Sequence, residues 1–122
     1  MKVAIIGASG NRQKFGNKAV RSYVAQGHEV FPVNPSEDTI EGLQAYKSVK
    51  DIPGAVDRVL LYVPGSVGVT VLEDIAQKGI TDVFVNPGAE SDELLERGEK
   101  LRLNMIQACA IVAIGDSPAR YS

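Results

Sequence analysis

The sequence predicts one α/β domain over residues 1–122, with a Rossmann-like, doubly wound, mostly parallel five-stranded sheet and helices on both faces. Short apolar segments alternate with longer segments whose apolar residues recur at helical spacing, which is the pattern of repeated strand-helix-strand units. Twelve glycines, few aromatic residues and no Trp are typical of a chain with many tight turns. A length of 122 residues, 44% of them hydrophobic, is enough for one packed core.

The first strand-helix-strand unit occupies the N-terminal third of the sequence. Residues 3–6 form a continuous apolar run, as expected for a strand that is buried on both faces. A helix is predicted over residues 15–24, because apolar residues recur there at helical spacing, and Gly27 follows as a stop signal. Residues 29–33 form the second predicted strand.

The middle of the chain has a weak pattern followed by a second clear unit. Residues 37–54 are predicted to be a crossover with a single helical turn that begins near Ser48 and is stopped by Pro53. Residues 58–63 form the third predicted strand, and the helix that follows ends at Gly79.

The last part of the chain supplies two more strands and one more helix. Residues 82–85 form the fourth predicted strand. Ser91 is expected to cap the next helix, whose first turn contains Asp92 and Glu93. Residues 105–114 are apolar enough to supply a fifth strand before a polar tail.

Charge and cysteine content exclude several classes of partner. The formal net charge of -2 leaves no basic surface of the kind that nucleic acid or an anionic membrane selects. No apolar run approaches the roughly 18 residues that are needed to span a bilayer. The single cysteine, Cys109, cannot form an intrachain disulfide, and the first residues do not have the pattern of a signal peptide. A cytoplasmic location is therefore predicted.

The loop after the first strand is the most informative candidate site, because ligands of doubly wound sheets bind beyond the carboxyl ends of the strands. Its small residues let backbone N–H groups and a helix N-terminus approach a phosphate, and Arg12 and Lys14 add positive charge. We predict an anion site here, although Gly16 could serve only helix packing and Asn17 could satisfy a loop backbone group. The residues assigned to this part of the site are Gly7, Ala8, Ser9, Gly10, Asn11, Arg12, Lys14, Phe15, Gly16 and Asn17.

This loop departs from the dinucleotide-binding pattern G-x-G-x-x-G. After Gly7, Ser9 and Arg12 stand where the second and third glycines belong. The acid expected after the second strand for a ribose hydroxyl is replaced by Asn34-Pro35, and Glu37 and Asp38 come slightly late. An NAD(P)-binding domain of an oxidoreductase or redox sensor is thus the alternative hypothesis. A third possibility is an interaction module whose loop is vestigial.

The loops after the third and fourth strands offer shape more than charge. Tyr62, Val63 and Pro64 form an apolar wall that suits a planar base, although an ordinary strand-to-helix turn would have the same sequence. Asn86 and Gly88 come after the fourth strand, at the same edge of the sheet. They either contact an amide-bearing arm of a ligand or simply form the turn.

No catalytic group of residues is apparent in the sequence. His28, the only histidine, lies at the entrance of the second strand, at the opposite end of the sheet from the predicted site. Cys109 lies in an apolar setting and is interpreted as a small core residue. One His and one Cys far apart do not make a zinc site. We therefore expect neither catalysis nor a bound metal.

The order and spacing of these segments resemble the stand-alone CoA-binding domain proteins, small relatives of the N-terminal domain of the succinyl-CoA synthetase α subunit. The likeness runs along essentially the whole chain. It implies no ligase chemistry, because the phosphohistidine of the synthetase belongs to a second domain. The resemblance is carried by Gly7-Ala8-Ser9, Lys14-Phe15-Gly16-Asn17-Lys18-Ala19, Pro32-Val33-Asn34-Pro35, Tyr62-Val63-Pro64 and Asn86-Pro87-Gly88.

The resemblance implies that the ligand is coenzyme A or an acyl-CoA. The amides of residues 8–11, together with Lys14, are then expected to hold the diphosphate. Residues 63–64 would flank the adenine, and the pantetheine arm would pass Asn86 and Gly88.

One position departs from the family pattern. Many relatives have a lysine directly after the Asn-Pro of the second loop, suited to a ribose 3′-phosphate, whereas this chain has Ser36. Arg12 or Lys14 is the expected substitute.

Overall fold

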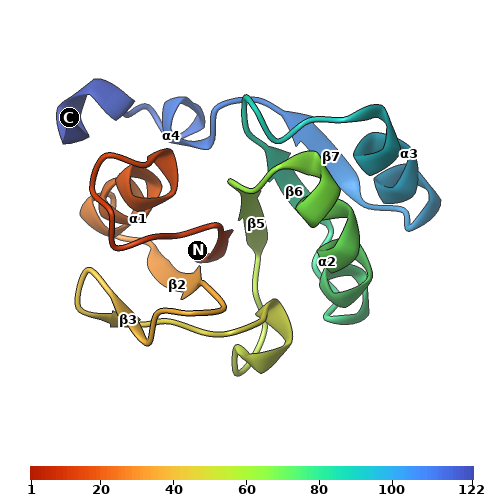
Figure 1. Cartoon of the computed structure of the whole chain (residues 1–122), viewed down its shortest axis with the longest axis horizontal. Coiled ribbons are helices and arrows are strands. Elements are labelled where there is room, and N and C mark those ends of the chain that lie inside the picture. The colour runs from red at the N-terminus through yellow and green to blue at the C-terminus, as the bar shows by residue number, and fades with distance from the viewer.

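Five strands form the central sheet of the computed structural model, which describes residues 1–122 (Figure 1). Their order across the sheet is β2-β1-β5-β6-β7, and every neighbouring pair is parallel. The predicted Rossmann-like fold class is confirmed. The strands are β1 (Lys2–Ile6), β2 (Glu29–Val33), β5 (Arg58–Leu61), β6 (Asp82–Val85) and β7 (Asn104–Gln107).

Helices cover both faces of this sheet, and α1 and α2 lie on opposite sides of β5 in Figure 1. One face packs against Val20 and Tyr23 of α1 and against Ile111 of α4. The other face packs against Leu72 of α2 and Leu94 of α3. Burial on both faces explains why the central strands are continuous apolar runs. The helices are α1 (Phe15–Ala25), α2 (Gly65–Gln77), α3 (Asp92–Lys100) and α4 (Ala110–Ala113), with 3-10 turns η1 (Val49–Asp51) and η2 (Pro118–Tyr121).

Two predicted helix starts are confirmed. At α3, the Oγ of Ser91 accepts a hydrogen bond from the N–H of Leu94 at 3.1 Å. At η1, the Oγ of Ser48 accepts from the N–H of Lys50 at 3.2 Å, and the turn ends before Pro53 as expected. Both contacts satisfy N–H groups that a helix cannot satisfy by itself.

The predicted fifth strand over residues 105–114 is wrong in its second half. Only β7 is extended, and the chain turns into α4 after it. The N–H of Ala110 donates to the Oδ1 of Asn86 at 2.9 Å, which fixes the start of α4 beside the end of β6. The short helix then buries Ile111 completely and leaves Val112 60% exposed.

The weakly patterned segment 37–54 contains a β-hairpin that was not predicted. Strands β3 (Thr39–Ile40) and β4 (Leu43–Gln44) pair in an antiparallel manner. The two residues between them, Glu41 and Gly42, both have positive φ, at 49° and 77°. Such turns suit the twist of a hairpin, but two-residue strands are too short to give a periodic signal.

The strand order creates a switch point between β1 and β5. Ile6 and Leu61 are partners in register at the carboxyl ends of these two strands. From there the chain continues from β1 to α1 on one face and from β5 to α2 on the other face. The two loops diverge, and the space between them is where ligands of such sheets bind.

Candidate functional site

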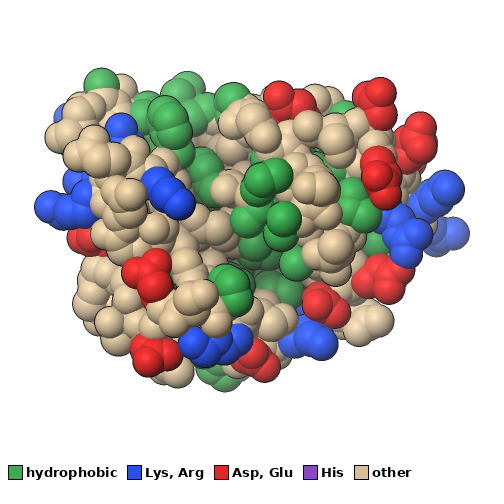
Figure 2. Space-filling view, viewed as in Figure 1, with side chains coloured by type: hydrophobic (Ala, Val, Ile, Leu, Met, Phe, Trp, Pro, Cys, Tyr) green, Lys and Arg blue, Asp and Glu red, His purple; other side chains and the backbone are tan.

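A cavity of about 620 Å³ opens beyond the carboxyl ends of β1 and β5. In the view of Figure 2, hydrophobic side chains occupy the middle of the face and charged side chains lie mainly toward its periphery. All four loops singled out in the sequence contribute to the lining. The lining residues are Gly7, Ala8, Ser9, Lys14, Phe15, Gly16, Asn34, Pro35, Tyr62, Val63, Pro64, Pro87, Gly88 and Ala89.

A smaller cavity of about 230 Å³ adjoins the large one, between the end of β2 and α2. Its walls include the aliphatic side chains of Val33, Val49 and Val67, and its one charged lining residue is Lys47. The two cavities lie side by side, because they share part of their lining. The shared residues are Gly7, Asn34, Pro35 and Val63.

Two glycines allow the first loop to lie close to its neighbours. Gly7 has a φ of 95°, and a Cβ on it would lie 2.6 Å from the carbonyl oxygen of Tyr62. A Cβ on Gly16 would lie 2.2 Å from the carbonyl oxygen of Gly7. Because these two residues have no Cβ, the end of β1, the loop after β5 and the start of α1 can meet at one point of the cavity wall. No larger residue fits at either position.

The N-terminus of α1 is open toward the large cavity. Lys14 is the N-cap residue and makes no capping hydrogen bond, and the first turn contains no acid. Phe15 and Gly16, the first helical residues, line the cavity. The first N–H groups of a helix have no partner within the helix and carry partial positive charge. An anion in the cavity is therefore favoured here.

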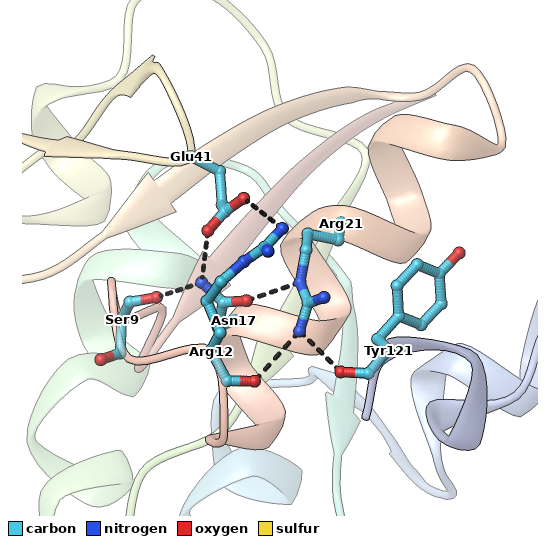
Figure 3. A network of polar contacts seen from close by, with 6 residues as sticks. All are labelled: Ser9, Arg12, Asn17, Arg21, Glu41 and Tyr121. Carbon is cyan, nitrogen blue, oxygen red and sulfur yellow. Dashed lines mark hydrogen bonds and ion pairs between the residues drawn. The ribbon is translucent and has the colours of Figure 1, made fainter.

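A polar network holds the first loop in place (Figure 3). Asn17 is fully buried, and its Nδ2 donates to the carbonyl oxygen of Ser9 at 2.8 Å and to the Oε2 of Glu41 at 3.0 Å. The Nε of Arg21 donates to the Oδ1 of Asn17 at 2.7 Å. Both polar atoms of the Asn17 side chain are therefore satisfied within the protein.

Two arginines extend this network to distant parts of the chain (Figure 3). The Nη2 of Arg21 donates to the carbonyl oxygens of Arg12 at 3.0 Å and of Tyr121 at 2.8 Å. The guanidinium of Arg12 pairs with Glu41 at 3.2 Å. The hydrogen bond from Asn17, followed by that from Arg12, lowers the pKa of the Glu41 carboxyl. The loop is thus tied to the β3–β4 turn and to η2.

Comparison with known proteins assigns this fold and these loops to a family. The family model described as "CoA binding domain" matches residues 1–115. The protein belongs to the CoA-binding domain family. The resemblance that was drawn from the loop segments is confirmed.

Relatives of this CoA-binding domain include parts of larger enzymes. The chain is 38% identical over 84 residues to the α subunit of acetate-CoA ligase (ADP-forming) II of Pyrococcus furiosus, a match that covers 68% of this chain and 18% of that subunit. It is 34% identical over 112 residues to the α subunit of acetate-CoA ligase (ADP-forming) I of the same organism, covering 86% of this chain and 24% of that subunit. The chain therefore spans a quarter or less of the length of these ligase subunits.

A solved structure matches the CoA-binding domain over almost its whole length. It is a conserved hypothetical protein from Pyrococcus furiosus that is 38% identical, with a TM-score of 0.87. The match covers 92% of this chain and 97% of that chain. The same fold therefore occurs in a protein of similar size.

The large cavity of the CoA-binding domain brings together most of the predicted site residues, but five of them line neither cavity. The N–H of Gly10 donates to the carboxylate of Glu37, at 3.1 and 3.0 Å from its two oxygens. The N–H of Asn11 donates to the Oγ of Ser9 at 3.0 Å. These polar groups are engaged within the loop or with the second loop. The five residues outside the lining are Gly10, Asn11, Arg12, Asn17 and Asn86.

Asn86 joins three elements of the fold. Its side chain is buried, and its Nδ2 donates to the carbonyl oxygen of Leu61 at 3.0 Å while its Oδ1 accepts from Ala110. The contact with a pantetheine arm that was predicted for Asn86 stays a prediction, and both polar atoms of this side chain have partners within the protein. Gly88 does line the cavity, together with Pro87 and Ala89, which the sequence analysis did not assign.

Two side chains in the lining carry polar groups without a partner. Lys14 has no carboxylate within ion-pair distance, so its charge is available to an anion in the cavity. The hydroxyl of Tyr62 is buried and has no hydrogen-bond partner. Burial raises the pKa of Tyr62, so this hydroxyl stays protonated and can donate.

The histidine and the cysteine lie outside both cavities. His28 precedes β2, and its Nδ1 lies 3.1 Å from the N-terminal amino group, which confirms its predicted position. Cys109 is a free, partly exposed thiol that packs beside the apolar cluster on the α1 face. No group of three or more His, Cys, Asp or Glu side chains is placed to hold a metal ion. None of the helices has the length and hydropathy needed to cross a membrane.

Proposed function

We propose that this CoA-binding domain binds coenzyme A, or an acyl-CoA, across its two neighbouring cavities and catalyses no reaction by itself. The observation that carries the proposal is the open N-terminus of α1 beside the unpaired Lys14, at the switch point of a sheet of this family. The proposed location is the cytoplasm, where the free thiol of Cys109 would stay reduced.

The diphosphate of the ligand is proposed to lie at the start of α1. Phe15 and Gly16 offer the first N–H groups of the helix, and Lys14 supplies a full positive charge. The amides of Gly10 and Asn11, which the sequence analysis assigned to the diphosphate, are already engaged. The anion site is therefore centred closer to the helix than the sequence alone indicated.

The adenine is proposed to occupy the smaller cavity. Its aliphatic walls, including Val33 and Val67, suit the faces of a planar base. Val63 lines both cavities and Pro64 lines the large one, so this loop would lie against the nucleoside. The pantetheine arm would leave the diphosphate along the large cavity, past Pro64 and Gly88.

Isothermal titration with CoA tests the proposal. We expect Lys14→Ala to weaken binding by about tenfold, or about 1.4 kcal/mol, because a charge-assisted contact to the diphosphate is lost. Lys100→Ala is the matched control, since Lys100 is an exposed lysine on α3 that lines neither cavity. Both variants should keep the melting temperature of the ligand-free protein.

Three outcomes would contradict this proposal. The first is the absence of detectable heat with about 1 mM CoA and a folded sample, which excludes even weak binding. The second is an equal loss of affinity and stability in Lys14→Ala, which would make Lys14 structural. The third is a thermal shift with NADH or NADPH and none with CoA, because a ligand that binds only the native state raises its melting temperature.

A further inference from the structure

The ribose of a bound CoA-type nucleotide must join the two cavities. In the proposed function, the diphosphate lies at the start of α1 and the adenine lies in the smaller cavity. The residues that line both cavities therefore surround the ribose, and Asn34 is the one among them with a polar side chain. These shared residues are Gly7, Asn34, Pro35 and Val63.

Asn34 connects this position to a carboxylate. The Nδ2 of Asn34 donates to the Oε2 of Glu37 at 3.1 Å and to the carbonyl oxygen of Ala8 at 2.9 Å. The Oδ1 of Asn34 accepts from the N–H groups of Ser36 at 2.7 Å and Glu37 at 3.0 Å. Because Glu37 also accepts from the N–H of Gly10, its carboxylate is fixed between the first and second loops.

The first loop is shaped to accept this carboxylate, and no cation neutralises it. A Cβ on Gly10 would lie 2.4 Å from the Oε1 of Glu37, so the close approach needs glycine. Of the basic side chains of this region, Arg12 pairs with the β3–β4 turn and Lys47 with Asp38 at 3.2 Å, while Lys14 at the start of α1 has no carboxylate within ion-pair distance. Glu37 has no ion-pair partner. Glu37 lines neither cavity, but its hydrogen bond with Asn34 places an unpaired negative charge next to the proposed ribose position.

We infer that Glu37 is a specificity-determining residue, and that the site prefers a nucleotide whose adenosine ribose carries no 3′-phosphate. Dephospho-CoA then binds more tightly than CoA. This inference rests on the proposed function and names the form of the ligand. A carboxylate accepts hydrogen bonds from hydroxyl groups and repels a phosphate dianion, and Ser36 beside it supplies no positive charge.

Titration of the same protein with CoA and with dephospho-CoA tests this preference. We expect the Kd of dephospho-CoA to be lower than that of CoA by threefold or more at low salt. Glu37→Gln removes the charge and keeps the shape, so it should reduce the ratio of the two Kd values at least threefold, mainly by strengthening CoA binding. Glu96→Gln is the control, since Glu96 is exposed on α3 and has no hydrogen-bond or ion-pair partner. It should leave the ratio unchanged.

Ser36→Lys provides a second test that does not depend on the folding of the Glu37 variant. A lysine on the exposed second loop beside the carboxylate should reverse the preference, so that CoA binds more tightly than dephospho-CoA. A wild-type ratio below threefold overturns the inference, as does an unchanged ratio in folded Glu37→Gln. If CoA binds as tightly as dephospho-CoA, only this inference fails. If neither nucleotide binds to the folded protein, the proposed function fails with it.

Discussion

The helices α1 and α3 follow strands of the same sheet, yet their N-termini differ in capping and in the charge of the first turn. At α3, Ser91 caps the helix, and Asp92 and Glu93 place negative charge in its first turn. At α1, Lys14 provides no cap, and the first turn has no acid. The positive end of α3 is satisfied by its own residues, whereas that of α1 faces the large cavity. Of these two N-termini, that of α1 is the one left open to an anion.

The support behind the two helix starts differs as well. The loop before α1 is held by the buried Asn17 and by Arg21, neither of which lines a cavity. The loop before α3 begins with Asn86, which bonds to the neighbouring β5 and α4. The side chains of Asn17 and Arg21 fix the first loop. The first N–H groups of α1 can therefore stay without a partner while the loop keeps its conformation.

The largest effect is expected from Gly16→Ala, which forces α1 away from β1. The new Cβ would meet the backbone of Gly7, which cannot move without the loop, so we expect the free energy of unfolding to fall by about 3 kcal/mol. In α3, a Cβ on Gly98 would meet the flexible end of Met105 at 2.5 Å. Gly98→Ala should lose less than about 1 kcal/mol, since alanine also favours the helix. Chemical denaturation measures both variants, and equal losses would contradict the close approach at α1.

A smaller effect is expected from Ser91→Ala, which removes the cap of α3. The free energy of unfolding should fall by about 1 kcal/mol. The affinity for CoA should not change, because Ser91 lines neither cavity. Lys14→Ala should show the reverse pattern, with weaker binding and unchanged stability. Denaturation and titration of the two variants in parallel test the comparison, which is wrong if both lose affinity equally.

The smallest effect is expected from a change in pH. It acts through Asp116, whose hydrogen bonds with Ser22 of α1 and Tyr121 of η2 form an anchor between these two elements. The hydroxyls of Tyr121 and Ser22 donate to Asp116 at 2.6 and 2.7 Å, and these bonds, that from Tyr121 first, lower the pKa of Asp116. A lowered pKa in the folded state gives stability that is present above the unfolded pKa of about 3.9 and is lost as the pH falls. We therefore expect the free energy of unfolding to decrease between about pH 5 and pH 3.

Asp116→Asn should make this decrease shallower in urea unfolding across the same pH range. The decrease should not vanish, because the pKa of Glu41 is lowered as well. Glu96→Gln is the control, since Glu96 is exposed on α3, has no hydrogen-bond or ion-pair partner and lies outside the anchor. An identical pH dependence in wild type and Asp116→Asn would show that the carboxylate is not part of the anchor.

The first strand-helix-strand unit and the edge of the sheet at which the large cavity opens could be predicted from the sequence. The apolar run 3–6, the helical spacing after Phe15 and the position of Gly7 are local signals, and each was interpreted correctly. The family resemblance rested on the same segments and was confirmed. Local pattern was sufficient wherever burial on both faces of the sheet decides the structure.

The rest depended on contacts between distant residues. The apolar run 105–114 is compatible with a strand or a helix, and a hydrogen bond from Ala110 to Asn86 decides for the helix. The sequence places Asn17 in the first turn of the predicted helix and allows it to satisfy a loop backbone group, but it does not show that the partner is the carbonyl oxygen of Ser9. From the sequence, Glu37 comes too late in the chain to be the acid expected after the second strand. The turn at Asn34 brings its carboxylate back to the first loop, and such a turn has no periodic signal.

The contacts of Arg21 also affect the order in which the parts of the protein fold during translation. It joins the backbone of Arg12 to that of Tyr121, a residue made 109 positions later. A ribosome that has released the first two strands and α1 has produced the first loop without its final support. That support arrives only after residue 121 has left the exit tunnel and folded back onto α1.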